Sequence, residues 1–371
     1  MDDKKLHIAM MGHKHMLSRE GGIEVAVYEL ATRMVAHGYS VICYDRGSSH
    51  ISGGKLDECG EYRGVRIRRV WTIPRKGLAA VTASFCAAVR ASVSSADVVH
   101  IHAEGPAVIS RIPKLAGKKV VVTVHGLDWV RAKWSGFAAK YIKWGEIQAV
   151  KYADEIIVLS ENLREYFKRE YGRDTAFIPN GVERPEIREA AEITEKWGLE
   201  KNGYVLFVGR IVPEKGLQYL LDAWKGLRTE KKLVIAGGSS DTQEFMRQLK
   251  RDAGDVIFTG FQQGRVLEEL YSNCFLYVLP SDLEGMPLSL LEAMSYGNCC
   301  VVSDIPECVE VVSDKAVTFR KSDAGDLRRT LQALLDDEER VNAYRRNAAD
   351  FICNKYNWDD VVDRTLELYR K

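Results

Sequence analysis

The stretch PSDLEGMPLSLLEAMSYG, residues 280–297, determines how we interpret the rest of the chain. It follows the apolar run of residues 275–279, which has the length of a buried strand. A polar loop comes next. Pro287 then opens a segment with apolar residues at helical spacing, and proline suits the first turn of a helix because its missing N–H is not needed there. The stretch therefore predicts a strand, a loop and a helix N-terminus, in that order.

The predicted loop and helix start have the properties of a phosphate site. Backbone N–H groups at a helix start lie at the positive end of the helix dipole and attract anions, and Gly285 allows close approach of the backbone. Glu284 in the loop and Glu292 further along the helix flank this site and can accept hydrogen bonds from sugar hydroxyls. The structural alternative is that Glu284 caps the helix and that Glu292 is solvated.

Length and composition predict two domains and no membrane span. A chain of 371 residues corresponds to roughly two domains, and an apolar fraction of 46% suffices for two cores. The net charge of +1 gives no global basic footprint for nucleic acid. No apolar run reaches the ~18 residues that a span needs, and residues 6–11 suggest a first strand instead of a signal peptide, so we expect a cytoplasmic protein. The eight cysteines contain no Cys-x-x-Cys pair, which indicates reduced structural thiols and no metal site.

The first half opens as a doubly wound parallel sheet does. A strand, residues 6–11, is followed by a glycine-containing loop, residues 12–22, and by a helix that ends at Gly38. The Gly-Gly pair that ends at Gly22 can hold a diphosphate, although any tight turn would also use such a pair. The absence of Gly-x-Gly-x-x-Gly argues against a nicotinamide site.

Histidines end or follow two later strands of this half. The run DVVHIH ends at His102, and the run KVVVTV, residues 119–124, is followed by His125. Ligands of such sheets bind at the carboxyl ends of the strands, so both histidines are candidates, and His125 can donate to a sugar hydroxyl. A core or capping histidine is an equally good interpretation of His102. Asp128 lies within reach of the same region.

Residues 129–152 combine aromatic and basic side chains: Trp129, Trp134, Phe137, Tyr141 and Trp144 with Arg131, Lys133, Lys140 and Lys143. Such a helix can rest on an anionic membrane surface or line an acceptor site. The alternative, which we favour, is an amphipathic helix whose aromatic side chains pack on the sheet and whose lysines are solvated.

The second half begins after the charged residues 183–201, which suggest an interdomain connection. The buried run of residues 204–208 is followed by Gly209, Arg210 and Lys215. Two cations at the carboxyl end of a strand can neutralise a diphosphate, arginine as a fork and lysine as a point charge. They would stabilise the charge that grows on a departing diphosphate without a metal. Taken singly, each cation is more often a surface residue.

Further strands and helices alternate through the rest of this half. The loops at Gly237 and at residues 261–263 can seat a base and a ribose. No Asp-x-Asp motif occurs, so a metal-bound diphosphate is not expected.

Together these motifs resemble the family 4 glycosyltransferases, which are retaining enzymes of the GT-B fold. The spacing from Glu284 to Glu292 matches the Glu-x7-Glu motif of that family, and Phe-Val-Gly-Arg…Glu-Lys-Gly around Arg210 and Lys215 is close to its second signature. His125 with its following glycine, and the glycine loop with Glu24, also occur in the family's order. Asn298 and Cys299 stand where family members usually carry a proline, so the donor contacts there could differ.

The resemblance implies an α/β protein with two Rossmann-like doubly wound domains facing each other across a cleft. The implied division is an acceptor-binding domain, residues 1–182, a donor-binding domain, residues 183–354, and a final helix, residues 355–371, that crosses back onto the first domain. Arg210 and Lys215 would hold the diphosphate, and Glu292 would bind the ribose. By expected role, the site residues are, for catalysis, His125, Arg210, Lys215 and Glu284; for the donor, Gly22, Gly209, Gly285, Met286, Pro287, Leu288 and Glu292; and for the cleft and acceptor, Glu24, His102 and Asp128.

The implied activity is transfer of a sugar from a nucleotide-diphosphate sugar, a UDP-sugar, with retention of configuration. The N-terminal motifs look most like those of enzymes that build bacterial capsule or exopolysaccharide, with a polyprenyl-diphosphate-linked acceptor at the inner membrane face. No cofactor, metal or nucleic acid is expected. Three alternatives stay open: a sucrose- or glycogen-type synthase with a soluble acceptor, a nucleotide-sugar 2-epimerase of the same fold, and a non-catalytic sugar-nucleotide-binding module.

Overall fold

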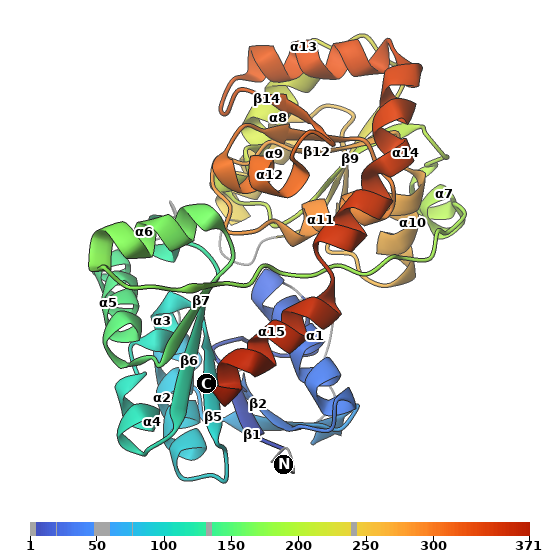
Figure 1. Ribbon diagram of the computed structural model, residues 1–371. Helices are drawn as coiled ribbons and strands as arrows, with labels where there is room; N and C mark the ends of the chain where they lie inside the picture. The colour runs from blue at the N-terminus through green and yellow to red at the C-terminus, as the bar shows by residue number, and fades with distance from the viewer. Residues whose placement is uncertain (1–4, 20, 48–59, 76, 131–135, 239–242) are drawn as a thin grey trace. The chain divides into compact units, whose positions relative to one another are not determined.

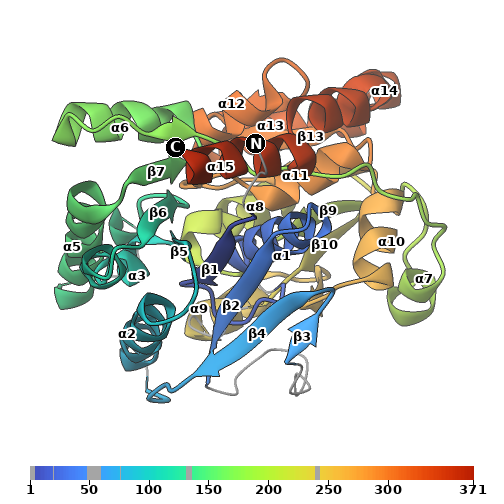
Figure 2. The same ribbon diagram turned by 60° about the horizontal axis from the view of Figure 1, so that its bottom comes forward.

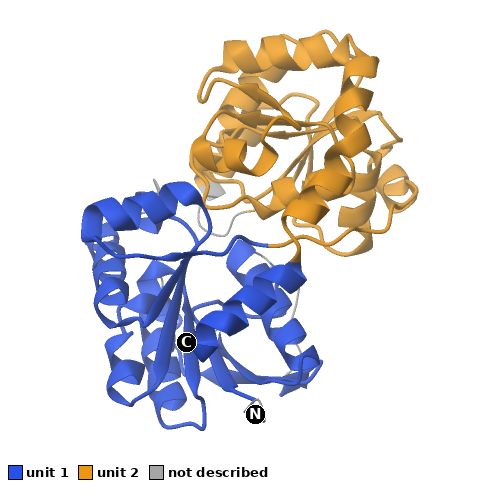
Figure 3. Cartoon of the chain, viewed as in Figure 1, with its two compact units in different colours: residues 1–180, 358–371 blue, residues 181–357 orange. Residues whose placement is uncertain are grey.

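The chain forms two compact α/β units in a computed structural model that describes residues 5–19, 21–47, 60–75, 77–130, 136–238 and 243–371. Unit 1 comprises residues 1–180 and 358–371, and unit 2 comprises residues 181–357 (Figure 3). The two predicted Rossmann-like sheets are therefore confirmed. The expected cleft between them, and the acceptor and donor roles expected of the two domains, stay predictions.

Unit 1 contains an eight-stranded sheet in the order β3-β4-β2-β1-β5-β6-β7-β8. Its strands are β1 (His7–Met11), β2 (Ser40–Arg46), β3 (Glu61–Tyr62), β4 (Val65–Val70), β5 (Val98–His102), β6 (Lys119–Val124), β7 (Glu155–Val158) and β8 (Ala176–Phe177). All neighbours pair in parallel except β3 and β4. The central strand β1 pairs with β2 and β5, with Ile8 opposite both Val41 and Val98. The run of β-branched residues in β6 is almost fully buried, as expected of a parallel strand covered on both faces.

The helices of unit 1 connect these strands (Figures 1 and 2). They are α1 (Gly22–Ala36), α2 (Leu78–Ser92), α3 (Glu104–Ala107), α4 (Arg111–Leu115), the 3₁₀ turn η1 (Asp128–Val130), α5 (Phe137–Tyr152), α6 (Glu161–Tyr171) and α15 (Trp358–Arg370). Helix α6 is capped at both ends. Ser160 accepts a hydrogen bond from the Leu163 N–H at its start, and Gly172 ends it in the left-handed conformation.

Helix α15 ends the chain inside unit 1, where it contacts α1. Trp358, Val362, Leu366 and Tyr369 are buried along it. Its end is also tied to the sheet, because the Tyr369 hydroxyl lies 2.5 Å from Nδ1 of His100 in β5. The last segment of the sequence thus completes the core that the first segment begins.

Unit 2 contains a six-stranded parallel sheet in the order β11-β10-β9-β12-β13-β14. Its strands are β9 (Tyr204–Val208), β10 (Lys232–Ala236), β11 (Ile257–Gly260), β12 (Leu276–Leu279), β13 (Cys300–Ser303) and β14 (Val317–Phe319). Its helices are α7 (Glu192–Trp197), the 3₁₀ turn η2 (Pro213–Lys215), α8 (Leu217–Trp224), α9 (Gln243–Asp252), α10 (Arg265–Asn273), α11 (Leu288–Ser295), α12 (Pro306–Val312), α13 (Ala324–Leu335) and α14 (Glu338–Lys355).

Two expectations about local structure need correction. The charged residues 183–201 do not form a plain connection, because they contain α7. The buried Glu269 of α10 accepts the backbone N–H groups of Ala191 and Ile193 at 3.0 and 3.2 Å, and so satisfies the start of α7.

The second correction concerns the aromatic side chains of α5. Phe137 and Trp144 are exposed and do not pack on the sheet, contrary to the favoured interpretation. The buried face of α5 is formed by smaller or polar residues, among them Gly145, whose Cβ position would lie 1.9 Å from the carbonyl oxygen of Glu104. A close helix crossing thus decides which face turns inward. Arg131, Lys133 and Trp134 lie outside the described residues.

Candidate functional site

Several of the predicted site residues lie in loops that follow neighbouring strands at which the strand order of a sheet reverses. In unit 2, β9 and β12 are neighbours, while β10 and β11 extend the sheet on one side and β13 and β14 on the other. In unit 1 the corresponding neighbours are β1 and β5. Loops at the carboxyl ends of such strand pairs diverge and leave a crevice, where ligands of open α/β sheets bind.

Lys215 and Glu284 meet where the loops after β9 and β12 leave the sheet of unit 2. Lys215 ends η2 after β9, and Glu284 lies in the loop after β12. Nζ of Lys215 lies 2.6 Å from Oε1 of Glu284, and the Ser281 hydroxyl donates to the same oxygen at 2.5 Å. Both charged side chains are largely buried, so water screens the pair weakly. The loops thus present a lysine whose position is fixed by a carboxylate before any ligand binds.

Backbone contacts hold these two loops together. Gly216 has a φ of +69°, and a Cβ there would lie 1.8 Å from the carbonyl oxygen of Pro280, so only glycine fits. The N–H of Asp282 donates to the carbonyl oxygen of Glu214 at 2.9 Å, and the Tyr219 hydroxyl donates to the Asp282 carboxylate at 3.1 Å. The Glu-Lys-Gly segment, residues 214–216, therefore holds the loops after β9 and β12 together and also supplies the positive charge of Lys215.

The start of α11 has the expected anion-binding form with one difference. Pro287 is the residue that precedes the helix, with a φ of −78° and a ψ of 97°, and is not its first helical residue. Among the described residues, no side chain caps this helix start. The backbone of residues 285–288 therefore forms the positive end of a helix dipole next to the Lys215–Glu284 pair.

Glu292 lies on α11, where the hydroxyl of Tyr271 donates to its Oε2 at 3.1 Å. Tyr271 is buried and stacks on Tyr296 with ring centroids 5.2 Å apart. One carboxylate oxygen of Glu292 is thus fixed by a rigid aromatic pair. Asn298, which stands where the family usually has a proline, is also structural, because its side-chain amide donates to the carbonyl oxygen of Tyr271 at 2.9 Å.

Arg210 and Gly209 follow β9 directly. Arg210 is half-buried, and within the described part of the chain its guanidinium makes no hydrogen bond or ion pair. Gly209 lies under the next loop, since a Cβ at Gly237, whose φ is +146°, would lie 1.8 Å from the carbonyl oxygen of Gly209. The loop after β9 therefore offers a second cation, whose guanidinium has no hydrogen-bond or ion-pair partner among the residues that the structure describes.

A line of three histidines runs through unit 1. His100 and His102 stack in β5 with ring centroids 4.1 Å apart, and Nδ1 of His102 lies 3.1 Å from Nε2 of His125 after β6. Nε2 of His100 lies 2.7 Å from the Thr123 hydroxyl. Burial lowers the pKa of His100 to about 3 and that of His102 well below its usual range, so both rings are neutral.

This geometry favours one tautomer of His125. Nε2 of His102 is buried and has no hydrogen-bond partner among the described residues. A buried N–H without an acceptor is rarer than an unfilled acceptor, so the ring proton of His102 belongs on Nδ1, where it is donated to Nε2 of His125. His125 then carries its own proton on Nδ1. The cavity beside these rings, about 20 Å³, is too small to hold a sugar.

The loop of Asp128 rests on two buried carboxyl groups that the sequence did not reveal. Oε2 of Glu104 accepts the N–H of Asp128 at 2.8 Å. Burial, together with the neighbouring Glu146, raises the pKa of Glu104 well above its usual range. Burial opposes ionisation of Glu146, but hydrogen bonds from the Glu104 carboxyl group, Lys143 and the hydroxyls of Tyr171 and Tyr166 outweigh it and lower its pKa. Nζ of Lys143 and the Tyr166 hydroxyl lie 2.8 and 2.9 Å from its Oε1. Glu104 and Glu146 could not be found from the sequence, since a lone glutamate in a helical pattern predicts a solvated residue.

The glycine loop of unit 1 is also internally bonded. Gly22 begins α1, and Oε1 of Glu24 accepts the N–H of Lys14 in the same loop at 2.9 Å. The ring of His13 bonds Asp45 at 2.8 Å; burial opposes ionisation of Asp45, but the bonds from His13 and His15 outweigh it and lower its pKa to about 2. The structure therefore gives Glu24 a loop-forming role in addition to the cleft role predicted for it.

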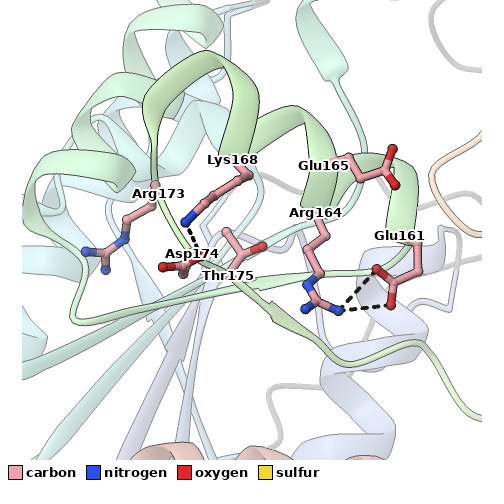
Figure 4. A pocket seen from close by; sticks show the side chains of 7 residues that line it. All are labelled: Glu161, Arg164, Glu165, Lys168, Arg173, Asp174 and Thr175. Carbon is pink, nitrogen blue, oxygen red and sulfur yellow. Dashed lines mark hydrogen bonds and ion pairs between the residues drawn. The ribbon is translucent and has the colours of Figure 1, made fainter.

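One larger hollow, of about 370 Å³, lies on α6 away from all of these residues (Figure 4). Four of its charged side chains form two pairs, Arg164 with Glu161 at 3.2 Å and Lys168 with Asp174 at 2.7 Å, and Arg173 donates to the backbone carbonyl oxygens of Ala153 and Asp154. Because it joins no predicted site residue, we regard it as a surface hollow between solvated ion pairs.

Over the described ranges, no group of three histidine, cysteine or acidic side chains is arranged to hold a metal ion. No helix among the residues that the structure describes is long and apolar enough to cross a membrane.

Comparison with known proteins identifies both halves of the chain. Residues 20–184 match the family model for Glycosyltransferase Family 4, and residues 189–351 match that for Glycosyl transferases group 1. The chain is 30% identical over 293 residues to the UDP-Gal:alpha-D-GlcNAc-diphosphoundecaprenol alpha-1,3-galactosyltransferase of Escherichia coli, covering 74% of this chain and 75% of that protein. It is 26% identical over 314 residues to the alpha-maltose-1-phosphate synthase of Mycolicibacterium smegmatis, covering 76% and 80%.

The fold matches solved structures along nearly the whole chain. HepE of Anabaena, solved in complex with UDP and glucose, superposes with a TM-score of 0.81 at 16% identity and covers 98% of each chain.

Proposed function

The chain belongs to the family 4 retaining glycosyltransferases of the GT-B fold, which use nucleotide-sugar donors, and on that premise we propose that it moves a sugar from a UDP-sugar to a lipid-linked saccharide acceptor. The acceptor would be a polyprenyl-diphosphate-linked sugar at the inner membrane face, in the assembly of a cell-surface polysaccharide. The relative of 30% identity, whose name specifies UDP-galactose and a diphosphoundecaprenol-linked acceptor, supports this choice of donor and acceptor.

The observation that carries the proposed donor site is the Lys215–Glu284 pair beside the start of α11. The bond to the sugar breaks as the nucleoside diphosphate leaves, and negative charge grows on the diphosphate oxygens. Lys215, Arg210 and the amides of residues 285–288 supply positive charge that is already in place, so little reorganisation is needed in the transition state. This set of charges supports departure of the diphosphate without a metal ion.

The remaining residues receive roles in the same reaction. Glu292, with one oxygen held by Tyr271, binds the ribose hydroxyls through its carboxylate. Glu284 accepts from the sugar, and His125 donates to it from Nδ1. The acceptor attacks from the face that the diphosphate leaves, the leaving phosphate takes the acceptor proton, and the configuration is retained. Asp128 and Glu24 line the acceptor side in this proposal, whereas the fully buried His102 acts only by positioning the ring of His125.

A soluble-acceptor synthase is the second candidate, favoured by the 26% identity to an alpha-maltose-1-phosphate synthase. The two candidates share a donor site and differ in the acceptor. Nucleotide sugars should first be ranked by the thermal shift that they cause, and the best donor should then be offered with either a polyprenyl-diphosphate sugar or soluble sugars and sugar phosphates. Turnover with the lipid-linked acceptor alone supports the proposal. Turnover with soluble acceptors alone would establish the second candidate, and an inverted product would contradict the mechanism.

A further inference from the structure

Helix α2 in unit 1 buries its small residues and exposes its large apolar residues, the reverse of the usual arrangement. Its buried side is made of small residues: Ala83, Ser84, Ala87, Ala88 and Ala91. Its opposite side carries Leu78, Phe85 and Val89, which are 46%, 53% and 40% exposed. These three are seven and four residues apart and therefore form one stripe along the helix. A helix that faces only water would turn its large apolar side chains inward.

Neighbouring elements extend this stripe. Trp71, just after β4, is 64% exposed, and Val93, just after α2, is 83% exposed. Leu115 of α4 is also exposed, and α4 contacts α2 (Figure 1). We refer to Trp71, Leu78, Phe85, Val89, Val93 and Leu115 as the α2 surface. Exposed apolar groups gathered in this way indicate a site of association.

The same part of the chain is strongly basic. Residues 62–96 contain six arginines, one lysine and no aspartate or glutamate, although the whole chain has a net charge of +1. Arg68, Arg75 and Arg90 are exposed beside the α2 surface. Arg90 also ties α2 to the adjoining strand, because its Nη1 donates to the carbonyl oxygen of Arg69 at 3.0 Å. The apolar stripe therefore has a cationic border.

We propose that the α2 surface docks on an anionic lipid bilayer, with the arginines at the headgroups and the apolar stripe among the upper acyl chains. Tryptophan and arginine are suited to this boundary, since each has an apolar body and a polar end. A second copy of the chain would place this cationic border against itself, and nucleic acid would leave the apolar stripe without a partner. The α2 surface shares no residue with the proposed donor site, and it adds a docking surface to a reaction that is already proposed to occur at the inner membrane face.

The test measures binding of the full-length protein to vesicles by flotation. Vesicles of phosphatidylcholine alone are compared with vesicles of phosphatidylcholine and phosphatidylglycerol in equal amounts. We expect binding to the anionic vesicles only, weakened by added salt. Phe85→Ser with Val89→Ser should weaken it about tenfold or more, because each lost side chain no longer enters the apolar phase. Arg68→Gln and Arg75→Gln should each weaken it about fivefold.

Matched controls lie in unit 2. Ile187→Ser with Val309→Ser removes two exposed apolar groups, and Arg247→Gln with Arg251→Gln removes two exposed arginines; neither pair should alter binding. Equal binding to both vesicle types, no binding, or equal loss in the controls would overturn the proposal. So would a dimer in light scattering that Phe85→Ser converts to monomer, or binding of single-stranded RNA that the arginine variants abolish.

Donor turnover with a soluble acceptor analogue separates this proposal from the proposed function. Phe85→Ser with Val89→Ser should turn over donor at the wild-type rate in that assay. Vesicle binding without turnover would contradict only the proposed function, and turnover without vesicle binding would contradict only the docking surface.

Discussion

At the scale of single residues, the most specific consequence of the structure is the ring proton of His125. The contact of 3.1 Å with His102, and the unpartnered Nε2 of His102, place that proton on Nδ1. Nitrogen-15 NMR of protein labelled at its eight histidines should show His125 with a protonated Nδ1 and a bare Nε2. His102→Phe, which removes the donor, should restore a mixture of tautomers. A protonated Nε2 on His125 in the wild type would contradict this assignment.

The buried histidines also make the folding stability depend on pH. The folded-state pKa of His100 is about 3, below its usual 6.5, because burial disfavours the charged ring. The unfolded chain therefore takes up a proton at a pH where the fold does not. The contribution of His100 to stability is therefore full above about pH 6.5 and falls by about 1.4 kcal/mol per pH unit as the pH drops toward about 3.

Chemical denaturation of wild type and His100→Gln at several pH values between those limits measures this effect. As the pH falls, the free energy of unfolding should decrease more steeply for the wild type than for His100→Gln, because the unfolded wild type takes up one more proton. A variant at the exposed His37 is the control and should keep the wild-type slope. Parallel slopes for wild type and His100→Gln would show that His100 is protonated in the fold.

The sequence alone identifies some of the candidate site residues and misses others. Lys215, Glu284 and Glu292 are predicted because short motifs fix their distance along the chain from a strand end or a helix start. Glu104 and Asp45 are not, because each is made important by partners far away in the sequence. Phe137 and Trp144 were placed wrongly because helical periodicity says which residues share a face, and tertiary packing says which face is buried.

At the scale of elements, α15 makes unit 1 depend on the last residues of the chain. Leu366 is 3% exposed, and its replacement by alanine should cost about 2–5 kcal/mol of unfolding free energy through lost contacts and an unfilled cavity. Tyr369→Phe, which removes only the hydroxyl bonded to His100, should cost about 1 kcal/mol. Urea denaturation measures both. A loss in Leu366→Ala no larger than that in a variant of the exposed Glu367 would show that α15 is not part of the core.

Strands were easier to predict than the segments between them. The buried runs of β6, β9 and β12 are long, apolar and bounded by glycine or proline, which leaves few alternatives. Helix α7 was missed because it is short, highly charged and stabilised from outside by Glu269. No local pattern in residues 183–201 carries that information.

At the scale of the whole molecule, the proposed reaction draws on both units. In that proposal, Arg210 and Lys215 of unit 2 bind the diphosphate, Glu284 and Glu292 of unit 2 bind the sugar and the ribose, and unit 1 provides His125 and the proposed membrane surface. The resemblance to the family implies this division between the units. In unit 2, the loops that carry Lys215 and Glu284 follow β9 and β12, the neighbouring strands at which the strand order reverses.

The central claim is that Lys215, already positioned by Glu284, binds the donor diphosphate. Calorimetric titration of UDP-glucose with a chelator present, into wild type, Lys215→Ala and the exposed control Lys225→Ala, tests it most directly. We expect wild type and control to bind alike, and Lys215→Ala to bind at least about tenfold more weakly, a loss of about 1.4 kcal/mol, with its fold intact by circular dichroism. Should another nucleotide sugar give the larger thermal shift, it replaces UDP-glucose in the titration. Equal affinity of wild type and a folded Lys215→Ala would contradict the account.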